Sequence, residues 1–223
     1  MSDDPFAFVL LTHENAAELS EFLNSHFLFE EPMNRACGMT QQNFQPFVDK
    51  LFERTLNIPF SYALVDKETN KIVACAMSSL WKNESKAESE NHGDEFEFDN
   101  GERKEIGVLG KILTELHAKF FELRPDIAQV LHLEILSVAK DYQRKGLASR
   151  LMSKMEDAEK IKEFNCSGIA SEISSLANQC LMKKRGYTTI TETLLSSECN
   201  ASGNPFIVTD DGTDRIILVH KNF

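Results

Sequence analysis

The sequence predicts one α/β domain over residues 1–223, with a mixed, twisted central β-sheet flanked by helices. Three observations support this fold class. Helix-type and strand-type periodicities alternate along the whole chain, which is typical of α/β domains. A length of 223 residues suits one domain better than two. The composition is 42% apolar and 26% charged, as in globular proteins, and the apolar runs are far shorter than the roughly 20 residues of a membrane span.

The N-terminal part alternates strands with helices whose apolar residues recur every three or four positions. Pro32 ends the first helix, because proline cannot continue the hydrogen-bond ladder and pushes Glu31 toward an extended conformation. A polar turn at 66–71 joins two strands into a hairpin. The predicted elements are a strand at 6–11, helices at 16–27 and 41–55, and strands at 62–65 and 72–80.

The stretch 82–105 changes character, with nine acidic and four basic residues. This composition predicts an acidic, solvated surface loop. Periodicity then returns, and a helix that opens at Gly146 carries one apolar stripe as far as Ile161. The remaining predicted elements are a helix at 106–120, strands at 128–138 and 168–173, a helix at 175–184, a strand after Gly186, and a hairpin of 206–208 with 215–220.

Charge and cysteine content exclude several classes of function. A net charge of −11 opposes binding to nucleic acid or to an anionic membrane surface. Five scattered cysteines without a C-x-x-C pair indicate neither a disulfide framework nor a zinc ribbon. The acidic start has no apolar segment of secretory length after it, so we expect no signal peptide. We expect a cytoplasmic monomer or homodimer.

The stretch 131–150 carries the clearest chemical signal, because a buried-type strand runs into a polar turn and then into a helix. Gly146 and Ala148 stand at the start of that helix, where free N–H groups and the positive dipole end can bind an anion. A missing or small side chain lets a phosphate approach the backbone. Arg144 and Lys145 add positive charge. The simpler alternative is a strand–turn–helix corner that needs one glycine.

The pattern Gln143-x-x-Gly146-x-Ala148, preceded by Leu136-Ser137-Val138, resembles the pyrophosphate loop of the GNAT acetyltransferase superfamily. The resemblance implies a GNAT-like fold, splayed at the strand before this loop, and acetyl-CoA as co-substrate without a metal. It also implies that the backbone of this strand pairs with the pantetheine arm and that an amide near Val138 meets the oxyanion. The acetyl-CoA-binding residues that it implies are Leu136, Ser137, Val138, Gln143, Arg144, Lys145, Gly146, Leu147, Ala148, Ser149 and Asn178.

A narrower resemblance links Glu30-Glu31-Pro32 to the arylalkylamine N-acetyltransferases of invertebrates. It implies that Glu31 is the catalytic base and that Ser174 matches one serine of those enzymes, while Asn178 stands at the position of a second serine. Many GNAT members carry a tyrosine acid four residues before the glycine that matches Gly186, but this chain has Met182 there.

The chemistry explains why a carboxylate is needed. A primary amine is mostly ammonium at neutral pH and must lose a proton before it attacks a thioester, so a nearby carboxylate can serve as base. For Glu31, the alternative is a solvated helix-end carboxylate. His132 and Glu134 share one strand face, opposite Leu131, Leu133 and Ile135. They match a His-x-His that serves as a proton path in vertebrate relatives of this enzyme class, so the resemblance implies a second candidate route for the proton.

For His132 the simpler alternative is a core histidine that bonds a backbone carbonyl. The other histidines show no ligand spacing and are expected on the surface or in helix packing, so no metal site is predicted.

The sequence therefore predicts an acetyl-CoA-dependent N-acetyltransferase of a small primary amine, with an arylalkylamine favoured. The alternatives are a polyamine, a lysine-like amino acid or a protein amine as acceptor. A different class is a member that binds acyl-CoA without turnover, for which Met182 and Asn178 are the warning signs.

Overall fold

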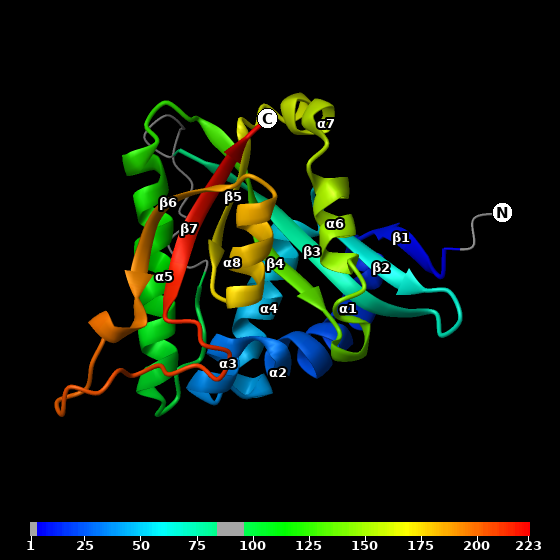
Figure 1. The fold of residues 1–223 in the computed structure, drawn as a ribbon. Coiled ribbons are helices and arrows are strands. Elements are labelled where there is room, and N and C mark those ends of the chain that lie inside the picture. The colour runs from blue at the N-terminus through cyan, green and yellow to red at the C-terminus, as the bar shows by residue number, and fades with distance from the viewer. Residues whose placement is uncertain (1–3, 84–95) are drawn as a thin grey trace.

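The computed structural model describes residues 4–83 and 96–223, which form a mixed seven-stranded sheet with helices on both faces (Figure 1). The sheet order is β1-β2-β3-β4-β5-β7-β6, and only the β4–β5 pair is parallel. The predicted fold class is confirmed. The strands are β1 (Phe6–Leu10), β2 (Tyr62–Asp66), β3 (Lys71–Lys82), β4 (Gln129–Val138), β5 (Gly168–Ile173), β6 (Thr188–Leu194) and β7 (Arg215–Asn222). The helices are α1 (Ala16–Phe22), α2 (Leu28–Glu30), α3 (Pro32–Cys37), α4 (Gln41–Thr55), α5 (Lys104–Leu123), α6 (Leu147–Met155), α7 (Ala158–Glu163) and α8 (Leu176–Lys184).

Two apolar cores lie on the two faces of the sheet. Helices α1, α3, α4 and α5 contribute to one core, and α6, α7 and α8 contribute to the other. Figure 1 shows α6 and α8 crossing in front of the sheet. None of the described helices is long and apolar enough to cross a membrane.

The first predicted helix is interrupted where the site begins. A π-helical turn (Leu23–Phe27) separates α1 from α2, and irregular turns of this kind often accompany functional sites. Glu31 is extended (φ −73°, ψ 121°), and Pro32 is the first residue of α3, a helix that the sequence did not predict. The proline ends one helix and starts the next because its missing N–H costs nothing at a first helical position.

Strands β4 and β5 separate after a short contact. They pair only at Leu131–Ile169 and His132–Ala170. The Ser171 hydroxyl then donates to the Leu133 carbonyl at 2.6 Å, so a side chain replaces the ladder where the backbones diverge. On the other edge of β4 the register with β3 shifts at Glu134, which is a β-bulge. The splay predicted at this strand is present.

Three sequence expectations need correction. The helix predicted from Gly146 to Ile161 is two helices, because Asp157 is extended and its side chain caps α7 at the Lys160 N–H. Residues 206–208 form no strand, and β7 pairs with β5 and β6 instead. The bulge places Ile135 in the core opposite to that of Leu131 and Leu133, because one extra residue reverses the alternation.

The acidic stretch 82–105 is not a solvated loop at its ends. Strand β3 runs through Lys82, and α5 begins at Lys104. The Phe98 ring stacks on Phe47 with centroids 5.1 Å apart, so this part packs on the core. The remainder of the predicted loop, 84–95, lies outside the described residues.

Candidate active site

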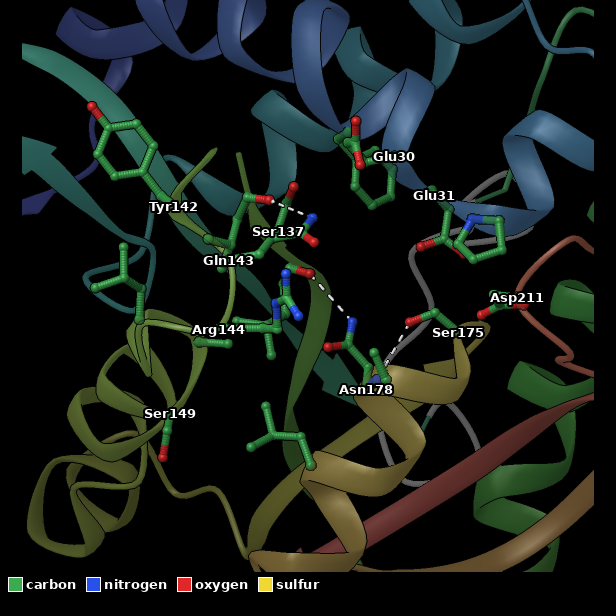
Figure 2. Close-up of a pocket in the computed structure, with 18 of the residues that line it drawn as sticks. Glu30, Glu31, Ser137, Tyr142, Gln143, Arg144, Ser149, Ser175, Asn178 and Asp211 are labelled. Atoms are coloured by element: carbon green, nitrogen blue, oxygen red, sulfur yellow. Dashed lines mark hydrogen bonds between the residues drawn. The ribbon is translucent and has the colours of Figure 1, made fainter. Parts of the chain in front are cut away.

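A cavity of about 500 Å³ opens where β4 leaves β5. Its walls come from the α2–α3 corner, the end of β4, the turn into α6, the first turns of α8, and Asp211 (Figure 2). The lining includes every residue implied for acetyl-CoA except Lys145, whose ammonium lies 4.7 Å from the centroid of the Tyr142 ring. Glu31 also lines this cavity.

The turn before α6 lines the cavity, and the first residues of this helix, whose N–H groups have no partner within the helix, line it too. Arg144 (φ +60°) and Gly146 (φ +78°) both adopt left-handed conformations, which turn the chain sharply into the helix. A Cβ on Gly146 would meet no protein atom within 4 Å, so this side of the turn is open to a ligand. The first amides of α6 follow directly, and Arg144 adds a cation at the cavity wall. The arrangement suits a phosphate group.

The backbone of β4 offers polar groups to the gap between β4 and β5. The Ala139 N–H donates to Val73 of β3 at 2.9 Å. Successive residues of a strand point their N–H and C=O groups to alternate sides, so Val138 and Leu136 face the gap. Two side chains confirm this direction, since Asn178 Nδ2 donates to the Leu136 carbonyl and Gln143 Nε2 to the Val138 carbonyl, each at 3.3 Å.

Glu31 is a buried carboxylate, not the solvated helix-end group of the alternative interpretation; it is 9% exposed. The Ser174 hydroxyl donates to its Oε1 at 2.8 Å. Burial raises the pKa of Glu31 to about 7, with a further increase from Asp211, while Ser174, the Met33 N–H and Arg35 oppose the shift. A carboxyl group with this pKa can both accept and release a proton near neutral pH.

Three residues singled out by the resemblance, Ser174, Asn178 and Met182, lie just before α8 or within it. Ser174 lies between β5 and α8, and Ser175 caps the helix by accepting from the Asn178 N–H at 3.4 Å. Met182 is fully buried in the core and is not among the residues that line the cavity. The chain thus offers no hydroxyl at either position where the resemblance expects one, Asn178 and Met182.

His132 and Glu134 share a face as predicted, with His132 Nδ1 4.0 Å from Glu134 Oε1. Neither lines the cavity. Both oxygens of Glu134 accept from Arg54 Nε at 2.8 Å, and the Glu134 side chain is 1% exposed. His132 is a buried core histidine, as in the simpler alternative, but it bonds the Glu172 carboxylate at 2.5 Å and not a backbone carbonyl.

Glu172 was missed at the sequence level, and so was its second partner, His117, at 3.0 Å. Burial opposes ionisation of Glu172, but the two imidazoles hold the pKa of its carboxyl below the usual range. Burial likewise opposes the charge on His132, yet Glu172 raises the pKa of that imidazole. Among the described residues, these three side chains are the only group close enough to hold a metal ion, with ligand atoms within 4.8 Å of one another. Their mutual hydrogen bonds account for the arrangement.

A sheet that splits beside a helix N-terminus, with a buried carboxylate at the same cavity, defines a protein that can bind an elongated anionic ligand along a strand and accept a proton beside it. The chain belongs to the GNAT acetyltransferase family, since the model of the Acetyltransferase (GNAT) family matches residues 33–187. This confirms the family and the enzyme class predicted from the sequence. Glu31 lies just outside the matched residues. No curated protein matches the sequence significantly.

Solved structures share the fold over nearly the whole chain. Arylalkylamine N-acetyltransferase 2 of Aedes aegypti is 19% identical with a TM-score of 0.82, covering 98% of this chain and 99% of that one. A polyamine N-acetyltransferase of Drosophila melanogaster is 15% identical with a TM-score of 0.72, covering 98% and 100%. The C-terminal condensation domain of Ebony is 14% identical with a TM-score of 0.71, covering 98% and 99%. At these identities the likeness shows the fold and not the substrate.

Proposed function

We propose that this protein transfers the acetyl group of acetyl-CoA to a small primary amine, with an arylalkylamine as the favoured acceptor. The observation that carries the proposal is the buried Glu31 carboxylate, which lines the cavity and accepts a hydrogen bond from Ser174. The invertebrate-type motif around Glu31 and the fold shared with the Aedes aegypti arylalkylamine enzyme support the choice of acceptor.

The residues at the other end of the cavity fit acetyl-CoA, which supplies an activated acetyl group as a thioester. The amides of Leu147, Ala148 and Ser149 would bind its diphosphate, with Arg144 adding charge. The backbone groups of Leu136 and Val138 that face the gap would pair with the pantetheine arm. Asn178 then has to leave the Leu136 carbonyl, to which it now donates.

Glu31 would remove the proton that the bound ammonium carries, and Ser174 would hold the carboxylate in position. The amine nitrogen then forms a bond to the acetyl carbon while the carbon–sulfur bond breaks, with the electron pair leaving on sulfur. Of the two protons that the ammonium loses, one goes to Glu31 and one to the departing thiolate, which becomes the free thiol of CoA. The Val138 N–H points into the gap and can stabilise the developing oxyanion.

Release of free CoA over an amine panel tests the proposal. The panel contains tyramine, putrescine, lysine and a peptide with a free N-terminus, each with and without enzyme. We expect the highest kcat/KM for tyramine. A clear preference for putrescine, lysine or the peptide would contradict the arylalkylamine assignment while leaving acetyl transfer intact.

A second candidate is a protein that binds acyl-CoA without turnover. The buried Met182 in place of a tyrosine, and the Asn178 amide on the Leu136 carbonyl, favour this interpretation. Tight binding of acetyl-CoA by calorimetry together with no CoA release from any amine would establish it.

A further inference from the structure

A segment far from Glu31 in the sequence contributes Asp211 to the side of the cavity where Glu31 lies (Figure 2). We call residues 198–214, between β6 and β7, the strap. Figure 1 shows it running below α8 toward α3. One end is fixed by the Phe206 N–H on the Glu198 carbonyl at 2.9 Å, and Ile207 is buried in the core. At the other end, Arg35 donates to both carboxylate oxygens of Asp210, at 2.9 and 2.5 Å.

The next residue, Asp211, lines the cavity and lies on the same side of it as Glu31 and Ser175 (Figure 2). A tight turn fixes its carboxylate, whose Oδ1 accepts from the Thr213 N–H at 2.9 Å and whose Oδ2 accepts from the Thr213 hydroxyl at 2.7 Å. Oδ2 also accepts from the Leu176 N–H, the first of α8, at 3.3 Å. Although partial burial opposes ionisation, these donors hold the pKa of Asp211 below its ordinary value, so it stays charged at neutral pH.

We propose that Asp211 binds the ammonium group of the substrate beside Glu31, so that the amine enters as a cation and loses its proton only after it is bound. This inference rests on the proposed function and adds a recognition residue to it. The cation would lie between one carboxylate that stays ionised, Asp211, and one that accepts its proton, Glu31.

The charges around Glu31 support a cation site. Glu30 of α2 and Asp211 of the strap both line the cavity with Glu31. The cation next to them is Arg35 of α3, and it is already engaged by Asp210 and by the backbone carbonyls of Phe29 and Glu30, at 3.1 and 2.5 Å. Because Asp210 neutralises Arg35, the negative charge of Asp211 is left for the substrate.

The arrangement also explains how Glu31 can take up a proton from an ammonium. The neighbouring carboxylate makes ionised Glu31 less favourable and so adds to the effect of burial on its pKa. Ammonium binding relieves this repulsion. After the proton moves to Glu31, Asp211 can still accept a hydrogen bond from the neutral amine and orient its lone pair.

Asp211 could instead serve only to hold the turn and the start of α8, and Asp211→Asn separates the two roles. The asparagine Oδ1 can still accept from the Thr213 N–H, its amide can donate to the Thr213 hydroxyl, and the Leu176 N–H keeps its 2.8 Å bond to that hydroxyl. The variant loses the 3.3 Å bond from the Leu176 N–H to Oδ2 together with the charge, but the other contacts that hold the turn can remain. Asp214→Asn is the matched control, since Asp214 lies on the same strap but is exposed and pairs with Arg215.

The experiment measures kcat and KM for tyramine from pH 5 to 9, the melting temperature, and calorimetric binding of tyramine and of its alcohol analogue tyrosol in the presence of CoA. For Asp211→Asn we expect KM for tyramine to rise about tenfold, as for the loss of one charge-assisted hydrogen bond. The preference for the amine over the alcohol should fall similarly. The acidic limb of kcat/KM should move to lower pH, because Glu31 loses a negative neighbour.

Asp214→Asn should match the wild type in every readout. Wild-type kinetics in Asp211→Asn would overturn the inference and leave the proposed function standing. So would a lower melting temperature with an unmoved acidic limb, because that outcome indicates a purely structural role. A wild-type protein that acetylates no amine would overturn the proposed function and this inference together.

Discussion

The two ends of the cavity are built in different ways. The end proposed for acetyl-CoA comes mainly from one continuous stretch, 136–149. Its proposed contacts are mostly backbone groups, and the left-handed Gly146 sets their geometry. The amine end is assembled from side chains far apart in sequence, since Ser174 and Glu31 are separated by 143 residues. A backbone site follows from local geometry, whereas a side-chain site depends on the whole fold.

Buried carboxylates show a second difference. Glu31 has a hydroxyl as its hydrogen-bonding partner, and burial raises its pKa. Glu172 has two imidazoles as partners, and its pKa is lowered. Glu134 is paired with Arg54. Burial without a strong cationic partner therefore suits Glu31 to its proposed role as proton acceptor, while Glu172 and Glu134 are paired with imidazole and guanidinium groups away from the cavity.

The largest expected effect is at the acetyl-CoA end. Gly146→Glu should abolish acetyl-CoA binding, because a carboxylate would stand where the diphosphate approaches the amides of α6, and a side chain at φ +78° is strained. Calorimetric titration of the folded variant measures this. Unchanged affinity would show that the turn before α6 is not the phosphate site.

The next effect is at the amine end. Glu31→Gln should lower kcat/KM by about 10²–10⁴-fold and remove the acidic limb of the pH–rate profile, because the acceptor is lost while the shape is kept. Acetyl-CoA affinity should stay the same. The exposed Glu21→Gln is the control, and Glu134→Gln and His132→Ala should be run beside it. If Glu31→Gln keeps its turnover while folded Glu134→Gln loses it, the β4 pair is the base.

The pair of Glu134 and Arg54 is expected to matter for stability. Arg54→Met leaves a buried carboxylate without its partner and should lower the free energy of unfolding by roughly 3–5 kcal/mol. Adding Glu134→Leu should recover much of this loss, because the uncompensated charge is then gone. Urea denaturation of the single and double variants measures both effects; equal stability of the two variants would contradict the assignment.

The ionised form of Glu31 should lower the free energy of unfolding at high pH. Its folded pKa of about 7 lies above the ordinary 4.5, so ionising it disfavours the folded state, and stability falls as pH rises from 4.5 through 7. Glu31→Gln should therefore be more stable than the wild type by roughly 2–4 kcal/mol at pH 8, with a much smaller difference at pH 5. Denaturant midpoints at the two pH values measure this. A difference that does not change with pH would mean that Glu31 is ionised in the fold without penalty.

The sequence by itself determined the features set by local backbone chemistry. Alternating periodicities predicted the α/β class. Gly146 predicted the turn before α6, and Pro32 predicted the chain break that leaves Glu31 extended. Each depends on steric limits that act within a few residues. The same reasoning missed the break between α6 and α7. The apolar periodicity continues across it, and the only local signal was the single capping residue Asp157.

Only the tertiary structure decided which polar side chains meet. Folding brings Ser174 within hydrogen-bond distance of Glu31, and Arg54 within hydrogen-bond distance of Glu134. It also brings His117 and His132 to Glu172, and Asp211 of the strap to the cavity. The bulge at Glu134 moved Ile135 to the other face of the sheet. A pKa depends on burial and on partners that the chain meets only after folding, so the spacing of carboxylates in the sequence cannot tell a base from one half of an ion pair.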